Sequence, residues 1–428
     1  MNASDSLIIV GAGTAAAELA VHTRMGGWSG RIIMIGDEAV LPYHRPPLSK
    51  AWLAGEADLS ALLTRPASVY EKAGIECWPG LAVTALDRAA KTIALSDGRS
   101  VPYGRLALCT GGRPRPWAAH GLPADHHPGN LHVLRTLADA ERLHGALQEG
   151  GRLLIVGAGY IGLEVAAAAR KRGVAVTVVE LASRVLARSA CDAVSSFYER
   201  LHAGRGVNVR TGSAVAQVQR ASAAPDAPVT ALELADGTRL PCDAILVGIG
   251  MLPNSELAEA AGLRVDRGIV VDNLSRTSDP DIVAAGDCTA QDLGCGTLRR
   301  LESVPNAVEQ ARAAASWLCG KPKPNLSVPW FWSDQYDVKL QMAGTSEGSD
   351  AIVRRGEIAA SSFTLFHLRE GVVIGATVVN RPGEFLQVKR LVGAQAIIER
   401  DLLEDDNLPL KDIVLPRVEN QAAQQVTP

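Results

Sequence analysis

Two short, purely apolar runs, at residues 7–10 and 153–156, each stand directly before a glycine-rich turn. A short apolar run that ends at a turn is typical of a strand buried on both faces. Each turn opens an alanine-rich stretch of helical length, and a second apolar run follows at residues 31–36 or 175–179. The pattern therefore predicts the unit strand, turn, helix, strand twice in one chain, as an internal duplication.

The segments that follow the two units also resemble each other. Residues 74–108 predict short strands in hairpins, with a turn at residues 96–98. A buried strand at residues 106–112 ends in glycines, and residues 244–250 repeat this pattern. Residues 220–228 predict a solvated loop between strands.

The composition changes near residue 328. Of the eighteen aromatic residues (7 Trp, 6 Tyr and 5 Phe), four lie within residues 329–336. Alternating strands and two amphipathic helices, one over residues 382–399 and a short final one, predict a separate α+β module that ends near residue 417. The last residues, 418–428, predict a frayed tail.

Composition is ordinary for a globular enzyme, with 47% apolar and 21% charged residues. A formal net charge of -3 gives no reason to expect nucleic acid or an acidic membrane surface as a partner. The N-terminus lacks the basic residues of a signal peptide, and the most apolar stretch, residues 153–169, is too short and too broken to span a membrane. The seven cysteines are scattered, without Cys-x-x-Cys or zinc spacing, which fits a reducing, cytoplasmic location.

The glycine-rich turns carry the chemistry. In residues 11–16 and 157–162, the first glycine (Gly11, Gly157) makes the turn and the second (Gly13, Gly159) lets the backbone approach a pyrophosphate. A small third residue, Ala16 or Gly162, lets the helix pack on the strand, and the helix N-terminus attracts the anion. One such turn is weak evidence, but two predict an α/β protein with two Rossmann-like dinucleotide-binding domains and a C-terminal α+β domain.

Each unit also offers an acid for a ribose. Asp37 and Glu38 follow the second strand of the first unit, and Glu180 occupies the matching place in the second. A carboxylate there accepts from a ribose 2′-hydroxyl and repels a 2′-phosphate, so we expect NADH to be preferred over NADPH. Arg184 and Arg188 lie close enough to leave that preference open.

Several other polar residues have both a functional and an ordinary interpretation. Asp287 follows a predicted strand at a glycine corner, where it could accept from a ribityl hydroxyl. Ser303 and Pro305 predict a helix start that could face a flavin, although a capped surface helix would have the same sequence. Lys50 and Glu164 stand out as charges, and each could also be an ordinary surface charge.

Thiol and metal chemistry are disfavoured. A dithiol reductase needs a redox pair, and the closest cysteines are Cys288 and Cys295. His126 and His127 stand in a Pro/Gly loop, where we expect them to be solvated and not to bind a metal.

Taken together, these residues resemble the putidaredoxin reductase family, NADH-dependent ferredoxin reductases with a glutathione-reductase-like FAD/NAD plan. The resemblance covers nearly the whole chain. It is carried by residues 45–50 (Arg-Pro-Pro-Leu-Ser-Lys), 110–115, 157–164, 277–280 with 286–288, 302–306 and 330–336. The first and last of these segments are the most specific.

The resemblance implies roles for individual residues. FAD would be held, together with the turn residues Gly11, Gly13 and Ala16, by Ala15, Asp37, Lys50, Val83, Arg135, Asp287 and Val304. NADH would lie on Gly157, Gly159, Ile161, Gly162 and Glu164, with Glu180 on its ribose. Lys50 would stand near flavin N5 and pair with Glu164, these two being the candidate catalytic residues.

The implied function is transfer of a hydride from NADH to FAD, and then of single electrons to a two-iron two-sulfur ferredoxin. That ferredoxin would serve a cytochrome P-450 monooxygenase or a ring-hydroxylating dioxygenase. Because ferredoxins are generally acidic, Arg65, Arg312 and Lys339 are candidate steering charges. The resemblance implies that Trp330 and Trp332 line the exit side of the flavin, in the module that faces the ferredoxin. Alternatives are a rubredoxin or nitrite-reductase partner, an NADH oxidase or peroxide reductase, and a non-enzymatic flavoprotein.

The resemblance also implies a domain plan. The FAD-binding domain would be discontinuous, over residues 1–113 and 247–328, with the NAD-binding domain at 114–246 between its parts. The interface domain would span residues 329–417 and be followed by the tail. The family includes monomers and weak dimers, so the expectation is a monomer or a weak homodimer.

Overall fold

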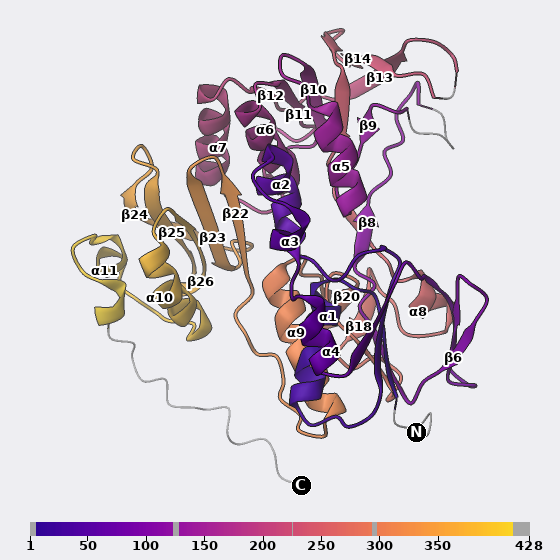
Figure 1. Cartoon of the computed structure of the whole chain (residues 1–428). Helices are drawn as coiled ribbons and strands as arrows, with labels where there is room; N and C mark the ends of the chain where they lie inside the picture. Colours follow the sequence, from indigo (N-terminus) through magenta and orange to yellow (C-terminus); the bar gives the residue numbers. More distant parts are fainter. Residues whose placement is uncertain (1–5, 123–127, 225, 293–297, 414–428) are drawn as a thin grey trace. The chain divides into compact units, whose positions relative to one another are not determined.

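The computed structural model describes residues 6–122, 128–224, 226–292 and 298–413. The chain divides into two compact units, Met1–Leu326 and Ser327–Pro428. Figure 1 gives the course of the chain through both. Cys295, His126 and His127 lie outside the described residues.

The first unit contains a parallel sheet in the order β19-β7-β1-β2-β3. Its strands are β1 (Leu7–Val10), β2 (Ile32–Gly36), β3 (Ile75–Pro79), β7 (Arg105–Leu108) and β19 (Ile282–Ala284). The residues of β1 are 0 to 6% exposed, as expected for a strand covered on both faces. One face packs under the helices α1 (Thr14–Met25) and α9 (Val304–Leu318), and the other under the core that includes Ile93 and Leu263.

A second parallel sheet in the same unit has the order β12-β11-β10-β16-β9. Its strands are β9 (Leu131–His132), β10 (Arg152–Val156), β11 (Ala175–Val179), β12 (Asn208–Arg210) and β16 (Ala244–Val247). The first four strands in this order correspond to β3-β2-β1-β7 of the first sheet, while the fifth, β9, precedes the others in the chain and β19 follows them. In each sheet the strand before the glycine turn is central, and the next strand in sequence lies beside it. The predicted duplication is therefore confirmed in the topology.

Each half also carries a three-stranded antiparallel sheet at the same point of its order. These are β4 (Val83–Asp87), β5 (Thr92–Leu95) and β6 (Ser100–Pro102), then β13 (Val215–Arg220), β14 (Val229–Leu234) and β15 (Arg239–Pro241). The predicted hairpins and the loop before β14 are thus present. A third small sheet joins β18 (Ile269–Val271), β20 (Thr289–Asp292) and β21 (Leu298–Arg299).

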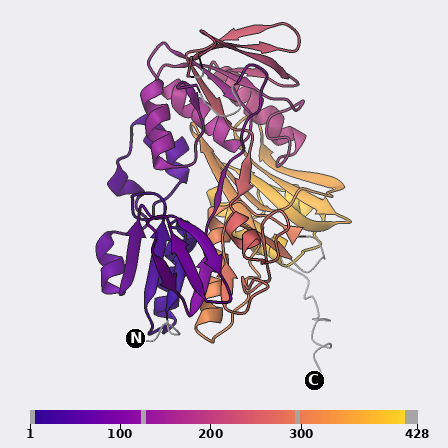
Figure 2. The ribbon, with the colours of Figure 1, turned by 90° about the vertical axis from the view of Figure 1, so that its right-hand side faces the viewer.

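The chain passes between the two parallel sheets along a two-stranded ribbon. Strands β8 (Gly112–Pro114) and β17 (Met251–Pro253) pair antiparallel, with Gly112 opposite Pro253. Figure 2 shows the two sheets at opposite ends of the unit. The remaining helices of the unit are η2 (Pro46–Ser49), α2 (Ala51–Ala54), α3 (Leu59–Leu62), α4 (Ala67–Lys72), α5 (Leu137–Ala146), α6 (Tyr160–Lys171), α7 (Asp192–Gly204) and α8 (Glu256–Ala260).

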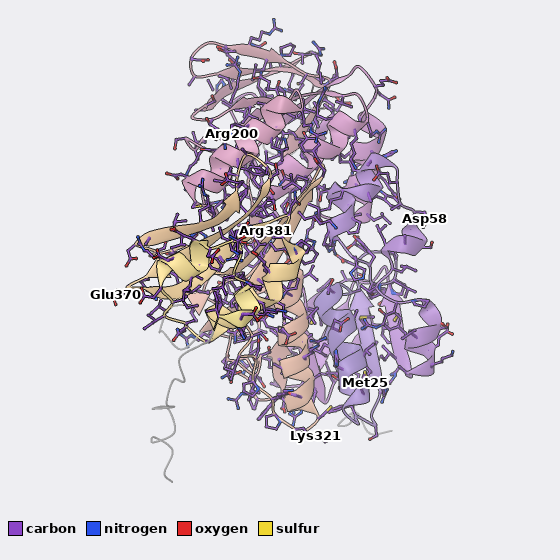
Figure 3. The ribbon with its side chains drawn as sticks, turned by 90° about the vertical axis from the view of Figure 1, so that its left-hand side faces the viewer. Met25, Asp58, Arg200, Lys321, Glu370 and Arg381 are labelled. Atoms are coloured by element: carbon purple, nitrogen blue, oxygen red, sulfur yellow. The ribbon has the colours of Figure 1, made fainter. Side chains whose placement is uncertain are left out.

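Helix α9 begins as predicted. The side chain of Ser303 accepts a hydrogen bond from the backbone N–H of Asn306, and Pro305 stands in the first turn. The helix packs along α1, and the ammonium of Lys321 donates to the carbonyl of Gly26 at 3.1 Å. Met25 and Lys321 therefore mark the same end of the helix pair (Figure 3).

The second unit is an antiparallel sheet in the order β22-β23-β26-β25-β24. Its strands are β22 (Trp330–Gln335), β23 (Val338–Gly344), β24 (Ala351–Glu357), β25 (Ser362–Arg369) and β26 (Val372–Val379). The helices α10 (Pro382–Gly393), α11 (Arg400–Glu404) and η3 (Leu410–Asp412) follow. Phe385, Val388 and Leu391 of α10 pack on one face of the sheet.

The predicted helix over residues 382–399 was too long, because it ends at Gly393. Gln395 has a positive φ of 47°, which turns the chain back. The backbone N–H of Val373 then donates to the carbonyl of Ala396, and Ile397 forms a bridge with Val372. These residues add to the sheet instead of continuing the helix.

Candidate nucleotide-binding sites

The first glycine of each turn is required by the protein itself. Gly11 has a φ of +109°, and a Cβ there would lie 2.1 Å from the carbonyl oxygen of Cys109. Gly157 has a φ of +104°, and its Cβ would lie 2.5 Å from the carbonyl oxygen of Gly248. Both glycines thus meet the backbone just beyond the neighbouring strand, β7 or β16. Only glycine fits either turn.

The second glycine of each turn is different. A Cβ added to Gly13 or Gly159 would meet no protein atom within 4 Å. These residues are the N-caps of α1 and α6, whose first turns carry no acidic residue and, in the described structure, no side-chain cap. The free backbone N–H groups and the empty space fit a pyrophosphate.

The third position distinguishes the two turns. A Cβ on Gly162 would lie 2.2 Å from the carbonyl oxygen of Gly157, so α6 sits directly on its turn. Ala16, the equivalent residue, is fully buried and carries a Cβ. The methyl group of Ala16 fits between α1 and its turn, as expected from the small size of alanine.

The two acids after β2 differ in their exposure and in their hydrogen bonds. Glu38 accepts from Arg45 and from the hydroxyl of Tyr43, each at 2.6 Å. Arg45 also donates to the carbonyl of Arg135 at 2.6 Å. Asp37 directly follows β2 and is exposed. Glu38 therefore fixes the loop, and Asp37 is the exposed carboxylate of the two. Nothing in the sequence marked Arg45 as the partner of Glu38.

Glu180 braces the second turn. Its two oxygens accept from the backbone N–H groups of Ala158 at 2.7 Å and Ala182 at 2.8 Å. Each carboxylate oxygen has a second lone pair, so a ribose hydroxyl can still be bound. Arg184 donates to Ser195 and to the carbonyl of Ala190, both at 2.7 Å, so its guanidinium is engaged within its own segment.

The glycine corner after β19 brings three implied FAD residues together. Asp287 pairs with Arg135 at 3.0 Å. A Cβ on Gly286 would lie 3.1 Å from that of Ala15, so the corner packs on the start of α1. The backbone N–H of Gly286 donates to the buried side chain of Gln310 at 2.8 Å. Gln310 has no signal in the sequence, because its partner is a backbone group from another element.

The other implied residues lie on three different elements. Val304 is the first residue of α9. Val83 opens β4, in a different sheet, and packs against the core beneath β1. Ile161, in the first turn of α6, is 44% exposed.

An ion pair connects the two nucleotide units. The ammonium of Lys50 lies 2.6 Å from Oε2 of Glu164, which is 3% exposed. The hydroxyl of Ser49 donates to the same oxygen at 2.5 Å. The pair implied by the resemblance is therefore present, and Ser49 is a partner that sequence reasoning missed.

Comparison with known proteins identifies the chain. Residues 5–311 match the family model of pyridine nucleotide-disulphide oxidoreductases, and residues 330–414 match the model of the reductase C-terminal domain. The chain belongs to the pyridine nucleotide-disulphide oxidoreductase family. This confirms the predicted fold, with two dinucleotide-binding modules and an added α+β domain, and the cofactors FAD and a pyridine nucleotide.

Three comparisons are informative, two with relatives and one with a solved structure. It is 46% identical to putidaredoxin reductase of Pseudomonas putida over 97% of this chain and 98% of that protein. It is 40% identical to the ferredoxin–NAD(+) reductase component of the anthranilate 1,2-dioxygenase system of Burkholderia cepacia, over 95% and 99% of the two chains. The crystal structure of a covalent putidaredoxin reductase–putidaredoxin complex matches with a TM-score of 0.90 and 46% identity, over 96% and 98% of the chains. These matches confirm the resemblance to the putidaredoxin reductases.

The family takes its name from a redox disulphide, and the cysteines of this member have a different character. The six that the structure describes are free thiols. Cys109 and Cys288 are buried, and burial raises the pKa of both thiols. Such thiols stay protonated and are poor nucleophiles.

The candidate partner contacts differ in their surroundings, and two of the three positive charges are already paired with an acid. Arg65 pairs with Glu18, and Arg312 with Glu309, each at 2.7 Å. Lys339 is exposed on β23. In the second unit, the rings of Trp330 and Trp332 have centroids 5.6 Å apart.

The ammonium of Lys389 lies 5.3 Å from the Trp330 ring centroid, which adds a positive charge beside this aromatic pair. No helix in the described part of the chain has the length and apolar character needed to cross a membrane. The same residues include no group of three or more His, Cys, Asp or Glu side chains that could hold a metal ion.

Proposed function

We propose that the protein is an FAD-dependent NADH:ferredoxin reductase that serves a cytochrome P-450 monooxygenase or a ring-hydroxylating dioxygenase. One observation carries the proposal. Two glycine-rich turns of the same construction lie in one unit, and the ion pair of the half-buried Lys50 with the buried Glu164 joins the segment after the first turn to the helix of the second. This arrangement suits two dinucleotides whose reactive rings must meet.

The first turn fits FAD. The space at Gly13 and the first turn of α1 would take the pyrophosphate, and Asp37 the adenosine ribose. Arg135 and Asp287, joined at 3.0 Å, would hold the ribityl chain, with Val83 and Val304 at the rims. The N-terminus of α9 would favour negative charge on a reduced ring.

The second turn fits the nicotinamide nucleotide. The space at Gly159 would take its pyrophosphate and Glu180 its ribose hydroxyl, which supports NADH over NADPH. Tyr160 begins α6 between that turn and Glu164, and burial raises its pKa to about 12. Its hydroxyl therefore stays protonated.

The chemistry divides between the cofactor and the chain. Bound FAD supplies two-electron acceptance from NADH and one-electron donation to a carrier. The turns orient the two dinucleotides, and Lys50 supplies a fixed positive charge whose position Glu164 sets. Orientation of the reacting atoms is the main contribution that a protein can make to hydride transfer.

The electron acceptor is proposed from the relatives and from surface charge. Two of the relatives are named as reductases of ferredoxin or putidaredoxin systems, and one structure is a reductase–putidaredoxin complex. Contacts with an acidic ferredoxin are proposed at Arg65, Arg312, Trp330, Trp332 and Lys339. A monomer or weak homodimer, a cytoplasmic location and the domain boundaries at residues 113, 246 and 328 belong to the same proposal.

The test is anaerobic stopped-flow spectroscopy. NADH should bleach the flavin absorbance of the purified holoprotein, and mixing with a two-iron two-sulfur ferredoxin should then restore it. Rubredoxin should restore it more slowly. Rapid oxygen consumption without a carrier would instead favour an NADH oxidase, and a long-lived complex of NADH with reduced flavin would favour a non-enzymatic flavoprotein.

A further inference from the structure

Two adjacent residues of the segment that follows the first nucleotide unit converge on one carboxylate oxygen of the second. Lys50 Nζ lies 2.6 Å and Ser49 Oγ 2.5 Å from Oε2 of Glu164. Ser49 and Glu164 are 1% and 3% exposed, so the hydrogen bond between them is shielded from bulk water. An O–H···O⁻ bond of this length is charge-assisted and among the stronger hydrogen bonds in proteins.

The single proton of the Ser49 hydroxyl has two possible acceptors. The carbonyl oxygen of Pro46 lies at 3.3 Å, and Glu164 is much closer at 2.5 Å. The Lys50 ammonium reaches the same carbonyl only at 3.5 Å. The hydroxyl therefore points its proton at the carboxylate, and this second donor fixes the rotation of the carboxylate about its last torsion.

The segment does not need this hydrogen bond for its attachment. Arg172 donates to the carbonyl of Leu53 at 3.1 Å and to that of Leu147 at 2.9 Å. Lys171 and Glu56 form a further ion pair at 3.4 Å. These bonds anchor α2 to the second nucleotide unit, so loss of the Ser49 hydroxyl should leave the segment in place.

We propose that Ser49 is a positioning residue for hydride transfer, acting through Glu164 on the Lys50 ammonium. The inference rests on the proposed function, in which Lys50 stands beside the reacting flavin ring. With one donor removed, the carboxylate can rotate and the ammonium can shift with it. Small displacements at a reacting centre are costly to rate even where binding is unchanged.

The test is the limiting rate of flavin reduction by NADH, measured anaerobically without ferredoxin. Ser49→Ala should lower this rate about tenfold, because a hydrogen bond to a charged group contributes on this scale. The NADH concentration for half-maximal rate, the FAD content and the melting temperature should stay at wild-type values. Ser49→Thr, which keeps the hydroxyl, should restore the rate.

A double-mutant cycle separates this role from a structural one. In a Glu164→Gln background the acceptor is neutral, so adding Ser49→Ala should change the rate by less than about twofold. Ser316→Ala is the matched control, since the Ser316 hydroxyl donates to the carbonyl of Ala313 at 2.7 Å and accepts from the backbone N–H of Lys323 at 2.8 Å, both near the end of its own helix. It should leave the rate unchanged.

Several results would overturn the inference. These are a wild-type limiting rate in Ser49→Ala, a second tenfold loss in the Glu164→Gln background, and loss of FAD or of thermal stability with a normal rate per bound flavin. Failure of the proposed function is distinct, because NADH would then leave the flavin of the wild-type protein oxidised.

Discussion

Three carboxylates lie at the candidate nucleotide sites, and each accepts hydrogen bonds from at least two donors. Glu38 is held by Arg45 and Tyr43, Glu164 by Lys50 and Ser49, and Glu180 by two backbone N–H groups. Two donors fix the orientation of a carboxylate where one would leave it free to rotate. The sites are thus preorganised at the level of single side chains.

The sequence predicted Glu164 and Glu180 and, through the family resemblance, the pairing of Glu164 with Lys50, but not the other donors to these acids. Ser49 is 115 positions from Glu164, and no local pattern relates the two. The donors to Glu180 are backbone groups, which every residue carries, so nothing in the residue types marks them. Residue types predicted the acids and Lys50, and only the tertiary structure revealed Ser49 and the two backbone donors.

Replacement of Glu180 tests its double role. Glu180→Ala should raise the ratio of kcat/KM for NADPH to that for NADH about tenfold or more, because the charge that repels a 2′-phosphate is removed. It should also weaken binding of both coenzymes, since Ala158 and Ala182 lose their acceptor. Steady-state kinetics with both coenzymes measures this.

Asp37→Ala is the matched control for Glu180. It should reduce retention of FAD and leave the choice of coenzyme unchanged, because Asp37 belongs to the first turn. An unchanged NADPH to NADH ratio in Glu180→Ala would contradict the assignment of the ribose acid.

A buried histidine makes the second unit sensitive to acid. His367 on β25 is 1% exposed; its Nε2 lies 3.2 Å from the Thr377 hydroxyl, and its Nδ1 has no partner among the described residues. Burial lowers its pKa to about 4, against about 6.5 in an unfolded chain. Between these values the unfolded state binds more protons, so stability falls as the pH drops through this range and is insensitive to His367 above it.

The expected loss over that range is about 3 kcal/mol. His367→Leu should therefore reduce the fall in melting temperature between about pH 7 and about pH 5, measured by circular dichroism. His120→Gln, at an exposed position, should melt like the wild type at both pH values. Equal acid sensitivity of the wild type and His367→Leu would show that His367 is protonated in the folded state.

At the scale of elements, the two glycines of each turn are needed for different reasons, the first for packing within the protein and the second for the space that a ligand would occupy. Gly11 and Gly157 are required by neighbouring carbonyls, whereas Gly13 and Gly159 face open space. Strand, turn and helix positions were predictable because their apolar runs and glycines are local signals. The end of α10 was not, because the pairing of Ile397 with Val372 is a tertiary contact.

The paired glycines give a matched set of variants. Gly13→Ala should leave the melting temperature of the apoprotein unchanged and weaken FAD binding about tenfold or more, since the new methyl group occupies only ligand space. Gly159→Ala should keep FAD and raise the KM for NADH. Fluorescence titration of the apoprotein with FAD and steady-state kinetics measure the two effects.

Gly162→Ala is the contrasting case, because its Cβ would collide with the carbonyl of Gly157. This variant should lower the melting temperature even without ligand. Destabilised apoprotein in Gly13→Ala would show that packing, and not a pyrophosphate, demands that glycine.

At the scale of the whole molecule, charge acts on the encounter with the partner. Arg65 and Arg312 are each paired with an acid, so the proposed docking surface is less positive than its arginines alone indicate. Arg312→Gln should slow ferredoxin reduction about threefold at low ionic strength and less at high ionic strength. Stopped-flow rates as a function of salt measure this.

Arg99→Gln removes an equally exposed arginine of the same unit, away from the proposed contacts. Arg99 pairs with Asp97 and is 52% exposed, close to the 50% of Arg312. It should leave the rate of ferredoxin reduction unchanged. Equal slowing in both variants would point to net charge and not to a docking position.

The ribbon of β8 and β17 has an architectural consequence. Pro114 and Met251 are opposite one another in it, so the chain leaves the half that contains the first parallel sheet and returns to it at neighbouring points about 5 Å apart. Residues 115–250 therefore form a cassette whose two ends lie side by side. We expect that a cassette from another reductase, grafted at this pair, would exchange the electron donor while all five strands of the first parallel sheet stay in place.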